Sequence, residues 1–207
     1  MGFETNVFVN CPFDDAYLPI LRPILFCVIA LGMDPRIALE RMDSGEPRVE
    51  KIVGLIRDSK FGIHDLSRLK ADHKGQLFRL NMPFELGLDA GCRTFGSGPH
   101  TEKRCLILEA ERFRYQAAIS DISGSDIAVH GNRPVEALTQ VRNWLSVAAD
   151  LKAPGPTKLW NHFNDFNAIH FRDLADRGYS PKDAKRQPIS ELLPAMKAWA
   201  GLNPIAT

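Results

Sequence analysis

The sequence predicts a doubly wound α/β fold, in which helices cover both faces of a parallel β-sheet of about five strands and a small helical extension follows. Two observations lead to this prediction. Over residues 1–152, short apolar segments alternate with longer segments of helical periodicity. Each helical segment is also long enough to form the crossover that two parallel strands require.

The expected strands are short, apolar and flanked by turn residues. Residues 6–11 form the first strand, which Pro12 ends because proline cannot donate to a sheet ladder. The other expected strands are residues 35–39, 60–65, 104–109 and 127–130.

The expected helices lie between these strands. Residues 17–31 are apolar almost throughout from Ile24, so this helix should be buried on most sides, with Gly32 as its C-cap. Residues 47–58 form an amphipathic helix with Val49, Ile52, Val53 and Ile56 at helical spacing. Further helices are expected over residues 135–148 and over residues 82–95, the latter with a core stripe of Phe84, Leu88, Cys92 and Phe95.

A joint at residues 153–156, Ala-Pro-Gly-Pro, divides the chain. We therefore expect a flavodoxin-like α/β domain over residues 1–152 and a helical C-terminal appendage over residues 157–207. The aromatic residues of the appendage should form its core, and a self-association surface is the alternative. These residues are Trp160, Phe163, Phe166 and Phe171.

Composition argues against several classes of protein. The 207 residues contain 26 Lys and Arg against 25 Asp and Glu, and a net charge of +1 gives no basis for generic nucleic-acid or membrane binding. The longest apolar run, residues 24–31, is far too short to cross a bilayer, so a cytoplasmic protein is expected. The four cysteines form no C-x-x-C pair, and no metal site is expected. The motifs of P-loop NTPases, Rossmann dehydrogenases, zincins and serine hydrolases do not occur.

Ligands of parallel sheets bind beyond the carboxyl ends of the strands, so polar residues that follow strands are the candidates. Glu85 is expected in the first turn of its helix, because Pro83 suits that position. Two interpretations of Glu85 are open. Its carboxylate either favours the helix dipole alone, or lies at the mouth of the strand-end cleft and stabilises or attacks an electron-poor carbon.

Further candidates follow the first and third strands. Asn10, Asp14, Asp15, Asp65 and Ser67 are expected to line a nucleoside pocket, although either of the paired aspartates equally suits a helix N-cap.

Arginines gather where the second strand should end. Arg41 is the candidate phosphate contact, since arginine binds phosphate bidentately and Arg36 and Arg48 lie near the same strand end. The alternative is that this segment only starts the next helix, for which Asp43 and Ser44 are suitable residues. His64, inside the third strand, suits a structural role better than that of a general base.

Three segments resemble the nucleoside 2-deoxyribosyltransferase-like and TIR-like proteins. Val-Phe-Val-Asn-Cys-Pro-Phe at residues 7–13 resembles the opening strand of that superfamily. Asp-Ser-Lys-Phe-Gly-Ile-His-Asp-Leu-Ser at residues 58–67 is similar to a later strand with its closing Asp-Leu-Ser. Asn-Met-Pro-Phe-Glu-Leu-Gly-Leu-Asp-Ala-Gly at residues 81–91, followed by the strand at 104–109, resembles its glutamate-bearing helix.

The resemblance implies that Glu85 is catalytic, because it matches the helix glutamate with which the superfamily cleaves or transfers N-glycosidic bonds of deoxynucleosides or of NAD. It implies no metal or cofactor beyond the nucleotide substrate. It also implies a homo-oligomer or a partner protein in bacterial antiphage defence. The implied substrate-binding residues are Asn10, Pro12, Phe13, Asp14, Asp15, Arg41, Asp65, Ser67 and Asn81.

The expected function is therefore cleavage or transfer of an N-glycosidic bond in a nucleotide, with NAD or a relative ahead of free deoxynucleosides. The alternative is a catalytically silent module of the same fold that senses a nucleotide or binds a partner protein. A scaffold that acts through the aromatic appendage is a third class.

Overall fold

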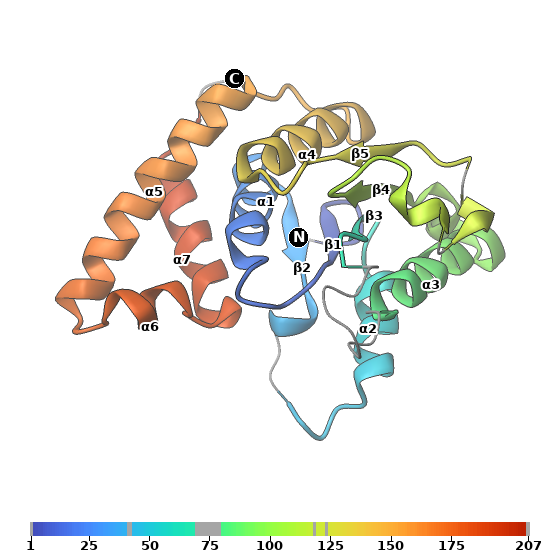
Figure 1. Ribbon diagram of the computed structural model, residues 1–207, viewed down its shortest axis with the longest axis horizontal. Helices are drawn as coiled ribbons and strands as arrows, with labels where there is room; N and C mark the ends of the chain where they lie inside the picture. The colour runs from blue at the N-terminus through green and yellow to red at the C-terminus, as the bar shows by residue number, and fades with distance from the viewer. Residues whose placement is uncertain (1, 41–42, 69–79, 118, 123, 206–207) are drawn as a thin grey trace.

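The computed structural model describes residues 2–40, 43–68, 80–117, 119–122 and 124–205. Five parallel strands form one sheet in the order β2-β1-β3-β4-β5, which confirms the predicted doubly wound α/β fold (Figure 1). The strands are β1 (Asn6–Asn10), β2 (Asp34–Arg36), β3 (Phe61–Asp65), β4 (Arg104–Glu109) and β5 (Ile127–Val129).

Helices cover both faces of the sheet (Figure 1). β–α–β connections are right-handed. The connection from β1 to β2 runs one way along the sheet and those from β2 to β3 and from β3 to β4 run the other way, so their helices lie on opposite faces. One face carries α1 (Leu18–Ala30) and α4 (Pro134–Ala148), and the other carries α2 (Arg48–Arg57) and α3 (Asn81–Phe95). The short 3₁₀ helices are η1 (Ala38–Glu40), η2 (Gly98–Glu102), η3 (Arg114–Ala117) and η4 (Ser120–Ile122).

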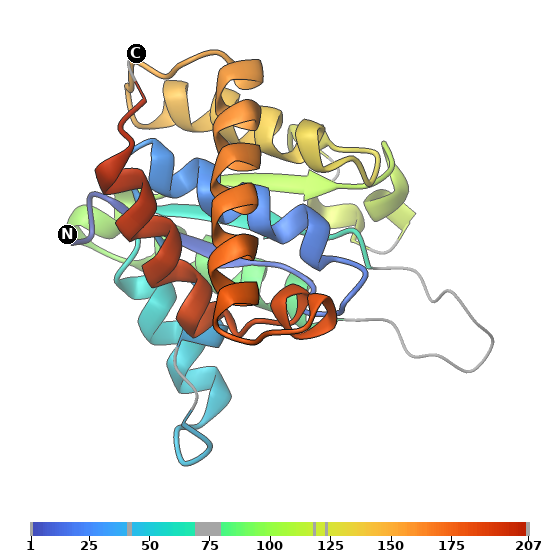
Figure 2. The same ribbon diagram turned by 90° about the vertical axis from the view of Figure 1, so that its left-hand side faces the viewer.

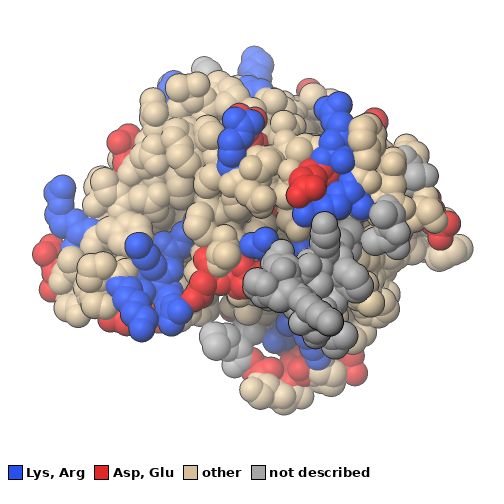
Figure 3. All heavy atoms as spheres, viewed as in Figure 1, with Lys and Arg blue, Asp and Glu red and all other residues tan. Residues whose placement is uncertain are grey.

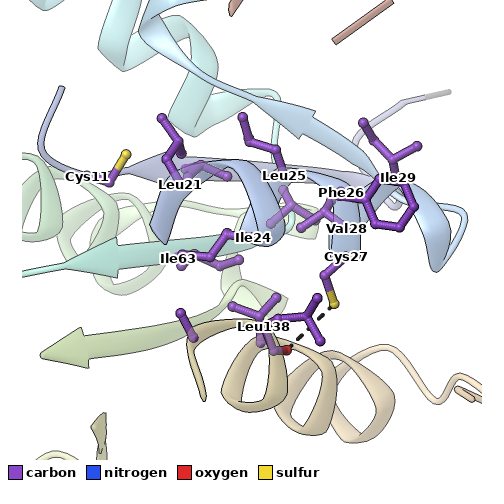
Figure 4. Packing of buried hydrophobic residues seen from close by; sticks show 14 of the residues in the cluster. Cys11, Leu21, Ile24, Leu25, Phe26, Cys27, Val28, Ile29, Ile63 and Leu138 are labelled. Carbon is purple, nitrogen blue, oxygen red and sulfur yellow. Dashed lines mark hydrogen bonds between the residues drawn. The ribbon is translucent and has the colours of Figure 1, made fainter. Parts of the chain in front are cut away.

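α1 is buried on nearly all sides, as its composition predicted. Every residue from 20 to 29 is buried, between the sheet and α4 on one side and the C-terminal helices on the other. The thiol of Cys27 lies 3.8 Å from the carbonyl oxygen of Leu138 on α4 (Figure 4). Gly32 follows the helix with a φ of +79°, a conformation in which glycine is not strained.

The C-terminal helices α5 (Pro156–Asp176), α6 (Pro181–Lys185) and α7 (Ile189–Leu202) form a layer outside α1 (Figure 2). Phe26 of α1 contacts both α5 and α7. Its ring centroid lies 5.6 Å from that of Phe166 on α5 and 5.8 Å from that of Trp199 on α7. One continuous hydrophobic cluster contains buried residues of the sheet, α1, α4, α5 and α7.

The expected core stripe of α3 is half right, because Leu88 and Cys92 pack against the buried cluster that contains Ile52 and Ile56 of α2. Phe84 and Phe95 are 55% and 89% exposed, whereas Glu85 and Asp89 face the sheet. The helix is turned in this way because the partners of its two carboxylates lie on other elements. On α2, Ile52 and Ile56 are buried as expected, but Val49 and Val53 are exposed.

Candidate functional site

The strand order changes direction between β1 and β3, and ligands of sheets with this order bind beyond the strand ends at that point. Asn10 ends β1 and Asp65 ends β3, and their side chains are 2% and 0% exposed. Two buried polar side chains at the switch point therefore mark the candidate site.

The Asn10 side chain joins three elements. Its Nδ2 donates to the carbonyl oxygen of Met82 at 2.8 Å and to Nδ1 of His64 at 3.0 Å. His64 Nδ1 is thus an acceptor, which leaves the ring proton on Nε2, 2.8 Å from Oδ2 of Asp89. These bonds hold the first turn of α3 against β1 and β3. No acidic residue lies in that turn, so the expected first-turn position of Glu85 is wrong: as the fifth residue of α3, it lies in the second turn.

Asp89 anchors α3 deeper in the same face. Burial alone would raise the pKa of Asp89, but His64 and Lys103 outweigh it and the pKa is lowered. Lys103 Nζ lies 3.0 Å from Asp89 Oδ1 and donates to the carbonyl of Ile56 at 2.7 Å. A Cβ atom on Gly62 would overlap Asp89 Oδ2 and lie 2.9 Å from His64 Nε2, so the bare backbone lets the helix approach.

Glu85 lies one helical turn before Asp89 and is 5% exposed. Burial raises the pKa of its carboxyl, and Arg48, whose Nη2 lies 3.6 Å from Oε1, opposes that rise. The Arg48 guanidinium also lies over the Phe13 ring, 6.0 Å from its centroid. A buried carboxylate with a raised pKa, on a helix that packs against the ends of β1 and β3, is a candidate catalytic group.

Asp65 accepts several hydrogen bonds at the end of β3. The Tyr17 hydroxyl donates to Oδ2 at 2.5 Å, the Ser67 backbone N–H donates to Oδ1 at 2.8 Å, and His130 Nε2 lies 3.0 Å from Oδ2. Burial alone would raise the pKa of Asp65, but the bonds from His130, Ser67 and Tyr17 outweigh it and the pKa is lowered.

His130, Ser67 and Asp65 do not form a hydrolytic triad. The Asn132 N–H donates to His130 Nδ1 at 3.1 Å, so Nε2 carries the proton. Ser67 Oγ, at 2.9 Å, and Asp65 Oδ2 both lie at this same nitrogen, whereas a triad places serine and aspartate at opposite nitrogens. His130 therefore holds Asp65 in place and does not activate Ser67.

Cys11 directly follows β1 and is buried. Burial raises the pKa of its thiol well above the usual value, and Asp65, Glu85 and Asp14 raise it further. The sulfur is therefore a neutral thiol rather than a nucleophilic thiolate. The charges of these three carboxylates therefore all act on the Cys11 thiol.

The paired aspartates of the β1–α1 loop separate. Asp14 stays at the rim of the site, where Oδ1 accepts a hydrogen bond from the Tyr17 N–H at 2.9 Å and Oδ2 lies 3.5 Å from Arg68 Nε. Asp15 instead pairs with Arg186, beyond the end of α6. Of the two, only Asp14 therefore contacts residues of the candidate site.

The remaining predicted residues differ in their positions. Pro12 is buried next to Cys11, Phe13 is half-buried beneath Arg48, and Asn81 is exposed at the first position of α3. Arg41 lies outside the described residues.

Sequence reasoning did not nominate several residues of the cluster. Glu109 ends β4 fully buried, and burial raises its pKa while Arg114 opposes the rise. Arg114 also donates to the Ser67 carbonyl at 2.6 Å. The rule about strand ends, applied to β4 and β5, would have found Glu109 and His130, but nothing in the sequence marked Tyr17 as a partner of Asp65.

Fold and site together define a flavodoxin-like α/β protein with a carboxylate-rich cluster at its topological switch point. The chain matches no family model, and no curated protein or solved structure is significantly similar to it. Among the described residues, no three His, Cys, Asp or Glu side chains are grouped so that they could hold a metal ion. In the same part of the chain, no helix combines the length and apolarity needed to cross a membrane.

Proposed function

We propose that this protein cleaves or transfers the N-glycosidic bond of a nucleotide, with NAD or a close relative as substrate and Glu85 as the catalytic carboxylate. The observation that carries the proposal is the position of Glu85, buried at the switch point and held there by the bonds of Asn10 to Met82 and His64. The resemblance of residues 81–91 to a glutamate-bearing catalytic helix supports the same assignment.

The reaction needs an anion beside the anomeric carbon of the sugar. When the bond from C1′ to the base breaks, its electron pair leaves with the base and the sugar becomes oxocarbenium-like. The ionised Glu85 carboxylate then stabilises this cation or bonds to C1′. Water next forms the new C1′–O bond, its proton passes to solvent, and the carboxylate is regenerated; another nucleophile in place of water gives transfer.

Electrostatics favours NAD over deoxynucleosides. The nicotinamide ring is cationic while attached to ribose and leaves as a neutral molecule, so it needs no proton from the protein. The carboxylates of Asp14, Asp65 and Glu85 near Cys11 suit a cationic ring. A purine or pyrimidine leaves readily only when an acid protonates it.

The neighbouring residues supply contacts for the rest of the nucleotide. We assign Asp14 and Ser67 to the ribose hydroxyls, Phe13 to a ring face, and Arg48 and Arg68 to the diphosphate, because arginine binds phosphate oxygens in pairs. On the resemblance to TIR-like proteins, we place the activity in bacterial antiphage defence in the cytoplasm, within a homo-oligomer or with a partner protein.

The decisive experiment measures nicotinamide release from NAD, and base release from a panel of deoxynucleosides, by chromatography. Glu85→Gln should lower the rate by about a hundredfold or more, because the neutral amide cannot stabilise the cation. Glu50→Gln is the matched control, since Glu50 is exposed on the adjacent helix α2, and it should keep wild-type activity. The wild-type rate should fall as the pH drops through the raised pKa of Glu85.

Other outcomes separate the alternatives. Equal activity of wild type and Glu85→Gln would show that Glu85 is a structural residue of the helix. NAD binding without base release by either protein would favour the silent sensing module, which tolerates glutamine at this position.

A further inference from the structure

A second hollow lies outside the strand-end cluster. A groove of about 550 Å³ runs between the start of α1, α5 and α6. Sites for small molecules typically measure about 300–1,000 Å³, so the groove has the size of such a site. Figure 2 shows α5 crossing in front of α1, with α6 at its lower end.

The α5 side of the groove is aromatic. The side chains that line the groove here are Trp160, Phe163 and Phe171. Trp160 and Phe163 are three residues apart and Phe163 and Phe171 are eight apart, so all three lie on one face of the helix. Phe163 is buried, while Trp160 and Phe171 are half-buried and keep part of their ring surface open. Asn167 lies on the same face and adds a polar group.

The opposite side of the groove is cationic. Lys182, Lys185 and Arg186 line it, and Figure 3 shows Lys and Arg side chains gathered over α6. Asp15 is the acidic residue of the lining, and Arg186 already pairs with it. Within the described part of the chain, neither exposed lysine takes part in an ion pair.

Arg22 supplies a buried cation at the groove. It is 8% exposed, and its Nη2 donates to the carbonyl oxygens of Ala184 at 3.1 Å and Lys185 at 2.9 Å. Its guanidinium lies over the Phe171 ring, 5.8 Å from the centroid, and its Nε has no hydrogen-bond partner among the described residues. Burial of a charged group is costly unless a counter-charge accompanies it, and an anion in the groove would supply that charge.

We infer that this groove binds a small molecule with a planar apolar body and one anionic group, the body against Trp160 and Phe171 and the anion towards Lys182, Lys185 and Arg22. Such a ligand fits the groove because its planar body can pack against the aromatic rings and its anionic group can pair with the cationic side chains. The inference does not depend on Glu85 or on the proposed reaction.

The test compares two ligands of nearly the same shape, the anionic naphthalene-2-carboxylate and the neutral naphthalene-2-carboxamide. Calorimetric titration into the full chain should give about tenfold tighter binding of the carboxylate, the size of one charge-assisted contact. In ¹H–¹⁵N spectra, the carboxylate should shift the Trp160 indole N–H and the backbone amides of α6.

Three variants complete the test, and Arg22 is left intact because its bonds to α6 also support the fold. The double change Lys182→Ala and Lys185→Ala should weaken carboxylate binding and leave carboxamide binding unchanged. Trp160→Ala should weaken both ligands. Lys152→Ala, at an exposed position outside the lining, is the matched control and should change neither.

Equal affinity for the two ligands, shifts confined to other parts of the chain, or no binding of either ligand would overturn the inference. Binding of an acidic aromatic peptide in place of the carboxylate would also overturn it, because the groove would then be a docking surface for protein.

Discussion

The Glu85 carboxylate is buried, and burial of its negative charge lowers the stability of the folded protein. Its pKa is raised on folding, so the folded state holds a proton more tightly than the unfolded chain. The resulting stabilisation is fully present below the unfolded pKa and is lost as the pH rises through the folded pKa. At neutral pH the ionised carboxylate is therefore a net cost to the fold, offset in part by Arg48.

We predict that Glu85→Gln raises the free energy of unfolding at pH 7, because the neutral amide replaces a buried charge. The expected gain is about 0.5–2 kcal/mol, which is typical of single stabilising substitutions. Urea unfolding of both proteins at pH 7 and at pH 4 measures the effect. The difference should shrink at the lower pH, where the wild-type glutamate takes up its proton. A variant less stable than wild type at pH 7 would show that the ion pair with Arg48 outweighs burial.

We predict that Gly62→Ala destabilises the protein by about 1–3 kcal/mol, because the added methyl group pushes Asp89 from His64 and leaves buried polar atoms unpaired. Gly54→Ala is the matched control. No atom lies within 4 Å of a Cβ placed there, and alanine in the middle of α2 should stabilise by roughly 0.5–1 kcal/mol. Thermal unfolding of the pair measures both changes, and a neutral Gly62→Ala would contradict the close approach.

Local periodicity could not predict how α3 is turned. A hydrophobic stripe through Phe84 and Phe95 follows from their apolar side chains, but the structure leaves both exposed. Glu85 and Asp89 face inward because Arg48, His64 and Lys103 lie on α2, β3 and just before β4. The order of apolar and polar residues within one helix does not show which residues of other elements its side chains will contact.

At the scale of elements, the strands and most helices were predictable because the alternation of apolar runs and helical segments is strong. Proline also marks element starts, at the first position of α4 and of α5. β2 covers Asp34–Arg36, whereas a strand over residues 35–39 was expected, because the 3₁₀ helix η1 already begins at Ala38. The positions of Asn10 and Asp65 at strand ends were enough to nominate them, whereas Glu85 was nominated from its place near a helix start and from the resemblance of residues 81–91.

We predict that Phe26→Ala lowers the free energy of unfolding by about 3–5 kcal/mol, because Phe26 joins α1 to both α5 and α7 and its loss leaves a cavity. Phe95→Ala is the matched control at the exposed end of α3 and should change stability by less than about 0.5 kcal/mol. Chemical denaturation of both variants distinguishes the two sites. Similar losses would mean that Phe95 is covered in solution.

At the scale of the whole molecule, the sequence predicted a helical segment after the Pro-Gly-Pro joint but not which surface it covers. One hydrophobic cluster joins the sheet domain to α5 and α7. Pairing between residues so distant in the chain cannot be inferred from composition or spacing.

We predict that a chain ending at Pro154 loses cooperative unfolding and self-associates, because removal of α5 and α7 exposes the outer apolar side of α1. Size-exclusion chromatography and calorimetry measure these changes. A monomeric truncated chain with a sharp unfolding transition would show instead that residues 1–154 fold independently.

The contact of α1 with α7 also has a consequence for synthesis. The first helix is made about 170 residues before the helix that completes its cover, which at roughly 5–20 residues per second is a delay on the order of ten seconds. Throughout that interval the most apolar segment of the nascent chain lacks its final partner. Production of this protein should therefore depend on chaperone capacity and translation speed far more than the stability of the finished fold would suggest.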